Sequence, residues 1–295
     1  MSGETTETIT AAGPKLRIGL LGVGLMGSAM GCRLLDQGFQ VIAWDRDPTG
    51  LAVLSEHGGV AAERPGDVIS GASAVITMLP TATVILDVLE PLLSSWPQGT
   101  IWLQMSSVGE QAADHLTRVA TARGITLVDA PVSGSTQPAA NGQLTILASG
   151  PALARKAVEP IFSALASRVL WVGAAGMGSR LKLATNHWMI SMVVALAESM
   201  QLCKAMGLDQ EQFIALLDGG PLGSAYAVQK LGEMRRHEYP AGFPVRLALK
   251  DLELVQEVAA STVLELPVLS AAIQRFTMAS EDLADRDLAA IYEVG

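Results

Sequence analysis

The glycine-rich segment Gly22-Val-Gly24-Leu-Met-Gly27 constrains the fold of this 295-residue chain more than any other feature. It directly follows the apolar run Leu16–Leu21, and a helical pattern begins near Gly24. At such a strand-to-helix turn, helix amides can bind a pyrophosphate, whereas the same spacing elsewhere is often an accidental loop. The segment therefore predicts a dinucleotide-binding turn. The residues expected to contact the cofactor there are Gly22, Val23, Gly24, Leu25, Met26 and Gly27.

Short β-rich runs alternate with longer helical stretches between Leu16 and Gly173. The expected strands are Leu16–Leu21, Gln40–Trp44, Ala74–Leu79, Thr100–Gln104, Thr126–Asp129, Leu144–Ala148 and Val169–Val172. Most are near-continuous apolar runs, which is typical of parallel strands covered by helices on both faces. The alternation predicts an α/β fold with a Rossmann-type doubly wound sheet.

The β signal disappears after about Ser179, and only helical patterns follow. The expected helices are Arg180–Ala205, Gln210–Leu217, Ala225–Arg236, Arg246–Ser261, Pro267–Ala279 and Arg286–Val294. We therefore expect a flexible tail at 1–15, a Rossmann domain at 16–178 and an all-helical substrate and dimerisation domain at 179–295, linked by a long helix. The tail has neither a basic start nor an apolar run, so it is interpreted as neither a signal peptide nor an anchor.

Composition excludes several classes of protein. The net charge of −9 argues against a general nucleic-acid binder, which needs a basic surface. The apolar stretch Met189–Ala197 is too short to span a membrane, because Glu198 interrupts it. Only two cysteines occur, Cys32 and Cys203, so no disulfide framework is indicated and a cytoplasmic location is expected. The histidines have no metal-ligand spacing, so no metal site is predicted.

An acid and a base follow the second expected strand. Asp45 lies close to the roughly 20 residues beyond the first glycine at which a ribose-binding acid is expected. Such an acid favours NAD(H), because it accepts bonds from the ribose hydroxyl and repels a 2′-phosphate. The neighbouring Arg46 could instead bind that phosphate or stack on adenine, so NADP(H) stays the alternative.

Lys182 and Asn186 are the strongest candidates for chemistry. Residues four apart on a helix share a face, so the ammonium and the carboxamide point into one cleft. Together they can hold a substrate oxygen and transfer a proton to it or from it. With a nucleotide-binding turn in the same chain, this pair predicts a dehydrogenase.

Four motifs in order resemble the β-hydroxyacid dehydrogenase family, which includes 3-hydroxyisobutyrate dehydrogenase and tartronate semialdehyde reductase. They are the glycine-rich Gly19–Gly27, the loop Asp129–Ser135, the helix with Gly178, Lys182 and Asn186, and Lys250-Asp251-Leu252. Ser135 stands where the family usually has glycine, and Gln104 stands where members often carry an acid.

The resemblance implies a role for each site residue. Lys182 would be the general acid and base, which requires its pKa to fall from about 10.4, and Asn186 would orient the substrate. Ser133 and Gly134 would hold the substrate carboxylate, with Ser135 as an added donor. Lys250 would close over the nicotinamide. The remaining cofactor groove would be lined by Met78, Leu79, Pro80, Ser106 and Ser107.

The predicted activity is interconversion of a small β-hydroxyacid and its semialdehyde by an NAD(H)-preferring homodimer or tetramer. The apolar segment Gly219–Tyr226 suggests a substrate less polar than a sugar acid. An imine reductase on the same scaffold is the alternative enzyme, although such enzymes usually replace the lysine that this chain keeps. A cofactor-binding interaction module without turnover is the alternative outside enzymes, but it would need none of Lys182, Asn186 and Ser133.

Overall fold

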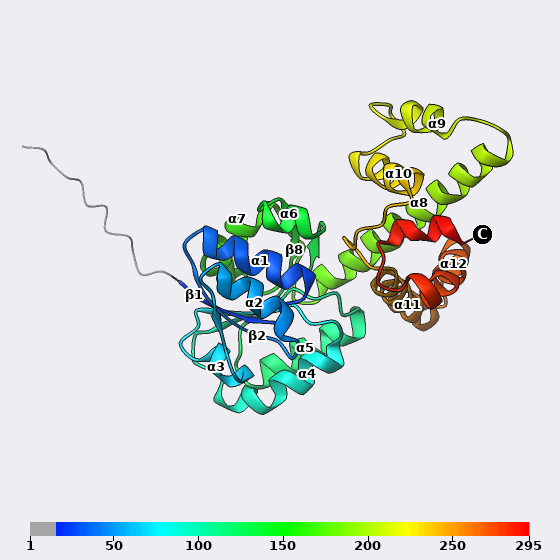
Figure 1. Ribbon diagram of the computed structural model, residues 1–295. Helices are drawn as coiled ribbons and strands as arrows, with labels where there is room; N and C mark the ends of the chain where they lie inside the picture. The colour runs from blue at the N-terminus through cyan, green and yellow to red at the C-terminus, as the bar shows by residue number, and fades with distance from the viewer. Residues whose placement is uncertain (1–15, 295) are drawn as a thin grey trace, which may run out of the picture.

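The computed structural model describes residues 16–294, and the expected tail at 1–15 lies outside them. Figure 1 shows two lobes joined by one long helix, α8 (Met177–Ala205). The first lobe is α/β and the second is helical, as the sequence predicts. Because α8 begins two residues before the expected domain boundary at 178/179 and runs through both lobes, that division of the chain stays a proposal.

The first lobe is built on a six-stranded parallel sheet of order β3-β2-β1-β4-β5-β6, which confirms the Rossmann-type fold. Its strands are β1 (Arg17–Leu21), β2 (Gln40–Trp44), β3 (Val60–Ala61), β4 (Ala74–Thr77), β5 (Ile101–Gln104) and β6 (Leu127–Asp129). The central strands are buried on both faces, which explains their continuous apolar runs.

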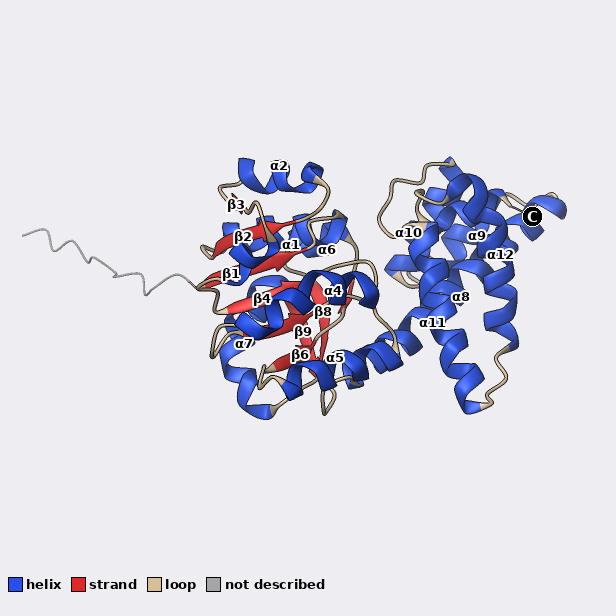
Figure 2. Ribbon diagram, turned by 90° about the horizontal axis from the view of Figure 1, so that it is seen from below, coloured by secondary structure: helices blue, strands red, loops and turns tan. Residues whose placement is uncertain are grey.

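Helices cover both faces of this sheet (Figure 2). One face packs against side chains of α1 (Leu25–Asp36), α2 (Pro48–Glu56) and α7 (Arg155–Leu165). The other packs against α3 (Pro65–Ile69), α4 (Ala82–Leu89) and α5 (Glu110–Ala122). Three short helices, α6 (Thr136–Ala140), η1 (Glu90–Ser95) and η2 (Ala152–Ala154), lie in the connections.

A second, three-stranded sheet contains the strands that follow β6. It consists of β7 (Val132–Ser133), β8 (Leu144–Ala148) and β9 (Ala166–Trp171), with β7 antiparallel to β8. The expected strands at Leu144–Ala148 and Val169–Val172 therefore do not extend the doubly wound sheet. β7 continues the direction of β6, because the Asp129–Ser149 bridge and the β7–β8 pairs share one antiparallel register. The chain reverses only between β7 and β8, so β8 runs against β6 and pairs with β7 and β9.

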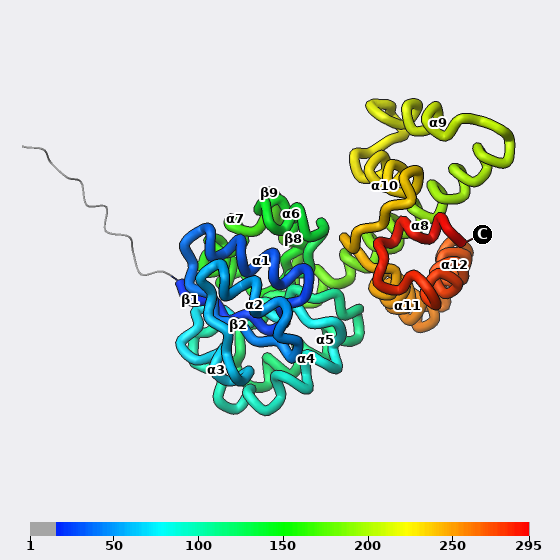
Figure 3. Tube along the Cα trace, in the orientation of Figure 1, coloured from blue at the N-terminus to red at the C-terminus, as the bar shows by residue number. Residues whose placement is uncertain are grey.

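The helical lobe packs around α8 (Figure 3). It contains α9 (Gln210–Leu217), α10 (Ala225–Arg236), α11 (Val245–Thr262), α12 (Pro267–Leu283) and the 3₁₀ helix η3 (Leu288–Glu293). The helix expected at Arg286–Val294 is shorter in the structure, where only Leu288–Glu293 are helical, as the 3₁₀ helix η3. Residues Leu288 to Tyr292 are all buried, so this segment lies inside the core of the helical lobe and has no polar face. Within residues 16–294, no helix is long and apolar enough to cross a membrane.

Candidate active site

The glycine-rich turn leaves the start of α1 open. Gly22 has a φ of +98°, and a Cβ added to it would lie 2.3 Å from the Met78 carbonyl oxygen. A Cβ on Gly27 would lie 2.0 Å from the Gly22 carbonyl oxygen, so both glycines are required for close packing. Gly24, the N-cap residue of α1, is exposed, and a Cβ added there would meet no atom within 4 Å. The first amides of α1 can therefore receive an anion.

Asp45 ties the end of β2 to this turn. Its Oδ2 accepts the Val23 amide at 2.6 Å, and its Oδ1 accepts the Asp47 amide at 3.0 Å. The neighbouring Arg46 is exposed, and within the described residues its guanidinium has no hydrogen bond or ion pair. The structure thus brings the predicted acid to the glycine turn and leaves the adjacent cation available to a ligand.

Buried Gln104 joins the loops that follow β4 and β5. Its carbonyl oxygen accepts the Ser106 amide at 2.8 Å, and its amide nitrogen donates to the Ser106 carbonyl oxygen at 2.8 Å. The Ser106 hydroxyl in turn accepts the Leu79 amide at 2.8 Å. A carboxylate at position 104 could not donate to the Ser106 carbonyl oxygen, because it has no proton to donate. From the sequence, Gln104 was noted only as a departure from the family pattern, and its hydrogen bonds to Ser106 were not predicted.

Lys250, on α11, brings the helical lobe onto the same two loops. Its ammonium donates to the Ser107 carbonyl oxygen at 2.7 Å and to the Pro80 carbonyl oxygen at 3.4 Å. It also lies 2.9 Å from Oδ1 of Asp251, an ion pair that lacks hydrogen-bond geometry. The predicted residues Met78 to Pro80, Ser106, Ser107 and Lys250 thus lie together where the lobes meet.

The start of α8 is anchored to the first lobe by Asp129, at the end of β6. This carboxylate is buried and accepts the Ser179 amide at 2.8 Å, the Ser179 hydroxyl at 2.7 Å and the Ser149 hydroxyl at 3.1 Å. Burial raises the pKa of Asp129, and these bonds oppose that rise. A Cβ on Gly178 would lie 2.2 Å from the Leu147 carbonyl oxygen, so only glycine fits this junction. Lys182 follows about one turn after Ser179 and is held by this anchor.

Half-buried Lys182 and buried Asn186, one turn apart on α8, both interact with Asp251 on α11. Burial lowers the pKa of Lys182 to about 8; Asp251 raises this pKa, and Lys250 lowers it further. The Asn186 amide nitrogen donates to Asp251 Oδ2 at 2.5 Å, while its carbonyl oxygen has no hydrogen-bond partner among residues 16–294. Asp251 belongs to the Lys250-Asp251-Leu252 motif, but its hydrogen bond with Asn186 on α8 was not predicted from the sequence.

The expected substrate loop follows β6. Ser133 is half-buried in β7, and Gly134 is exposed with a φ of +128°, a conformation that favours glycine. Ser135 caps α6 without a side-chain bond, so its hydroxyl is not committed to the helix. A Cβ on Gly242, in the helical lobe, would lie 3.7 Å from the Ser135 Cβ. The loop therefore lies at the boundary between the lobes.

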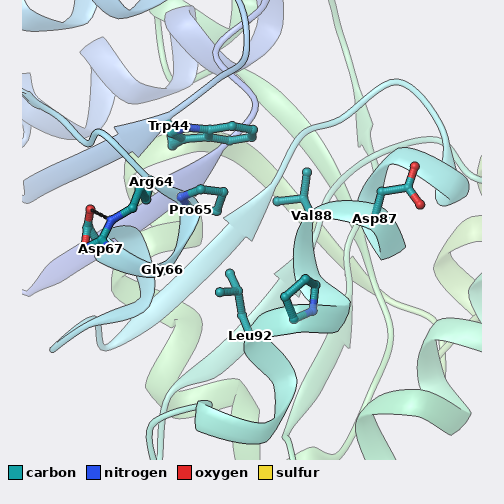
Figure 4. A pocket seen from close by; sticks show the side chains of 9 residues that line it. Trp44, Arg64, Pro65, Gly66, Asp67, Asp87, Val88 and Leu92 are labelled. Carbon is teal, nitrogen blue, oxygen red and sulfur yellow. Dashed lines mark hydrogen bonds and ion pairs between the residues drawn. The ribbon is translucent and has the colours of Figure 1, made fainter.

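Figure 4 shows an apolar pocket of about 530 Å³ beside the end of β2. Trp44, Pro65, Val88 and Leu92 line it, together with Arg64, Gly66, Asp67, Asp87 and Pro91. None of the predicted site residues lines this pocket, although Trp44 directly precedes Asp45. Among residues 16–294 as a whole, no group of three or more His, Cys, Asp or Glu side chains could hold a metal ion.

Family models match both lobes. Residues 17–173 match the NAD-binding domain of 6-phosphogluconate dehydrogenase. Residues 176–294 match the domain described as the NAD-binding part of NADP-dependent 3-hydroxyisobutyrate dehydrogenase. The gap between the two matches, residues 174–175, lies just before the start of α8 at Met177.

Similar proteins cover nearly the whole chain. Glyoxylate/succinic semialdehyde reductase 1 of Arabidopsis thaliana is 33% identical over 94% of this chain and 98% of its own. The crystal structure of 3-hydroxyisobutyrate dehydrogenase from Salmonella typhimurium has a TM-score of 0.87 at 25% identity and covers 95% of this chain and 100% of its own. A solved structure of the Mycobacterium tuberculosis 3-hydroxyisobutyrate dehydrogenase with L-serine has a TM-score of 0.85 at 26% identity and covers 95% of this chain and 99% of its own.

Proposed function

The chain belongs to the β-hydroxyacid dehydrogenase family of NAD(P)-dependent oxidoreductases, and on that premise we propose that it interconverts a small β-hydroxyacid and its semialdehyde, with Lys182 as proton donor and acceptor. The observation that carries the proposal is the half-buried Lys182, whose ammonium interacts with Asp251 of the Asn186–Asp251 pair, where the lobes meet. The relatives are named for hydroxyacids and semialdehydes of this kind.

A lysine pKa of about 8 suits a proton carrier near neutral pH. During reduction the ammonium donates its proton to the carbonyl oxygen, and during oxidation the neutral amine takes the hydroxyl proton. Asn186 is held by Asp251, and its buried carbonyl oxygen, which has no partner among residues 16–294, is the acceptor that we assign to the substrate. Ser133, Gly134 and Ser135 hold the substrate carboxylate through hydroxyl and backbone N–H donors, an arrangement that needs no metal.

The first lobe fits a nicotinamide dinucleotide, which supplies or accepts the hydride when bound. The open amides of α1 suit its pyrophosphate, and Asp45 suits its ribose. The loops at Met78–Pro80 and Ser106–Ser107 line the groove, and Lys250 closes it from the other lobe. We propose NAD(H) as the preferred cofactor, because Asp45 repels a 2′-phosphate; the unpaired Arg46 makes that preference modest and NADP(H) usable.

Two further assignments extend the proposal. Several large apolar side chains of the helical lobe are exposed, including Trp188 at 62% and Leu216 at 70%, which supports assembly into a homodimer or tetramer. Both cysteines are free thiols, which suits a reducing cytoplasm.

The proposal is tested by assaying short hydroxyacids, semialdehydes and cyclic imines with each nicotinamide cofactor. Turnover of at least one hydroxyacid–semialdehyde pair, with no imine reduced faster, is expected. Imine reduction without semialdehyde reduction would establish the alternative enzyme. Cofactor binding with no turnover of any compound would favour the interaction module.

A further inference from the structure

The loop Pro240–Phe243, between α10 and α11, contacts the loop that carries Ser135. A Cβ added to Gly242 would lie 3.7 Å from the Ser135 Cβ, an ordinary van der Waals distance. Ser135 belongs to the α/β lobe and Gly242 to the helical lobe. The two lobes therefore approach each other closely beside the loop to which we assign the substrate carboxylate.

The loop is fixed from behind by Asp287, which is fully buried. Oδ2 of Asp287 accepts the Phe243 amide at 3.0 Å, and its Oδ1 accepts the ammonium of buried Lys230 at 2.7 Å. The Phe243 carbonyl oxygen accepts the Leu288 amide at 2.9 Å. Lys230 also donates to Glu233 at 2.8 Å, and Oδ1 of Asp287 also accepts the Ala289 amide at 3.0 Å, so the buried charges are paired on every side. The Phe243 end of the Pro240–Phe243 loop is thus tied to the core of the helical lobe.

Close packing, and not the backbone conformation, explains the glycine at position 242. Its φ lies outside the left-handed region, so the backbone would allow a side chain there. A Cβ would stand 3.2 Å from Asp287 Oδ2 on one side and face Ser135 on the other. Any side chain at 242 would therefore fill the gap between the Asp287 anchor and the substrate loop.

We propose that Ser135 and Gly242 close the carboxylate end of the substrate pocket and set the length of the ω-oxo acid that the enzyme reduces. Lys182 defines the reacting end, and the Pro240–Phe243 loop, tied to Asp287 through the Phe243 amide, limits the room at the other end. The Ser135 side chain narrows this end relative to a glycine, whereas the missing side chain at Gly242 widens it. The inference rests on the proposed function, because it takes the Ser133–Ser135 loop as the carboxylate site.

The test compares kcat/KM for succinic semialdehyde with kcat/KM for malonic semialdehyde, at saturating cofactor. Malonic semialdehyde is one methylene shorter and gives a β-hydroxyacid on reduction. One methylene in a fitted pocket changes such a ratio by roughly 10- to 200-fold. We expect Gly242→Ala to lower the ratio by about 10-fold or more, and Ser135→Gly to raise it by about 10-fold. Gly232→Ala on α10, where the new Cβ meets only the flexible end of Arg236 at 3.1 Å, is the matched control and should leave the ratio unchanged.

An unchanged ratio in both Gly242→Ala and Ser135→Gly would overturn the proposal. If thermal melting shows that Gly242→Ala is not folded, Ser135→Gly alone decides, and a ratio equal to wild type rejects the assignment. Failure of the proposed function gives a different result, since the wild-type enzyme would then reduce neither oxo acid while still binding cofactor.

Discussion

Asn186 on α8 donates its amide to Asp251 Oδ2 on α11 at 2.5 Å, and both side chains are almost fully buried. Lys182 lies one turn before Asn186, where the charge of Asp251 raises its pKa and that of Lys250 lowers it. Lys250 and Asp251, which are adjacent in the sequence, therefore shift the pKa of Lys182 in opposite directions. The position of α11 against α8 determines the balance between them.

The first prediction is a pair of opposite pH shifts. Reduction needs the Lys182 ammonium, so its rate should fall as the pH rises through about 8, and oxidation should rise over the same range. Asp251→Asn removes the charge that raises the pKa and should move both profiles to lower pH. Lys250→Met removes the charge that lowers it and should move them to higher pH. The pH dependence of kcat/KM in each direction, which reports groups of the free enzyme, measures this, and shifts of the same sign in the two variants would contradict it.

The second prediction concerns Gln104. Gln104→Leu leaves the buried Ser106 amide and carbonyl without partners, so the free energy of unfolding should fall by about 1–3 kcal/mol. The KM for cofactor should rise as the Ser106–Ser107 loop loosens. Urea unfolding and initial rates measure the two effects. The exposed Gln98 offers a control, because Gln98→Leu should change stability by less than about 0.5 kcal/mol. Equal effects of the two substitutions would refute a role for the Gln104 network.

The third prediction concerns cofactor choice. Asp45→Asn removes the charge that repels a 2′-phosphate and keeps Arg46, so preference should swing toward NADP by roughly 1–3 kcal/mol. The measurement is the ratio of kcat/KM values for NAD and NADP, in wild type and variant. A wild-type enzyme that already prefers NADP would show that Arg46 governs this pocket.

The fourth prediction concerns assembly. Because Trp188, Leu202 and Leu216 are more than half exposed, the wild-type chain should sediment as a dimer or larger species at micromolar concentration. Trp188→Lys should weaken this association. A stable wild-type monomer under these conditions is the result that rules the assignment out.

Local patterns were sufficient to predict most of the fold. The strands at Gln40–Trp44 and Leu144–Ala148 and the helices at Gln210–Leu217 and Ala225–Arg236 have the predicted bounds. The two-residue strands β3 and β7 were missed, because a period of two cannot be recognised in two residues. The separate small sheet was also missed, because strand pairing is decided by contacts between distant residues.

The candidate site, too, was predictable from the sequence only in part. The placement of Lys182 and Asn186 on one helix follows from a spacing of four residues, and the structure confirms that they share an environment. The bonds from Asn186 to Asp251 and from Lys250 to Ser107 join residues 65 and 143 positions apart. No periodicity in a single sequence encodes such pairs. The sequence therefore predicted the candidate groups but not the contacts that adjust them.

The central claim is that Lys182 transfers the substrate proton. Its most direct test is the rate of hydride transfer in a single turnover, followed by nicotinamide absorbance, in Lys182→Ala and in the exposed-lysine control Lys156→Ala. We expect Lys182→Ala to bind cofactor with near-normal affinity and to lose roughly two to four orders of magnitude in rate, while the control keeps the wild-type rate. A rate for Lys182→Ala close to that of wild type would contradict the assignment.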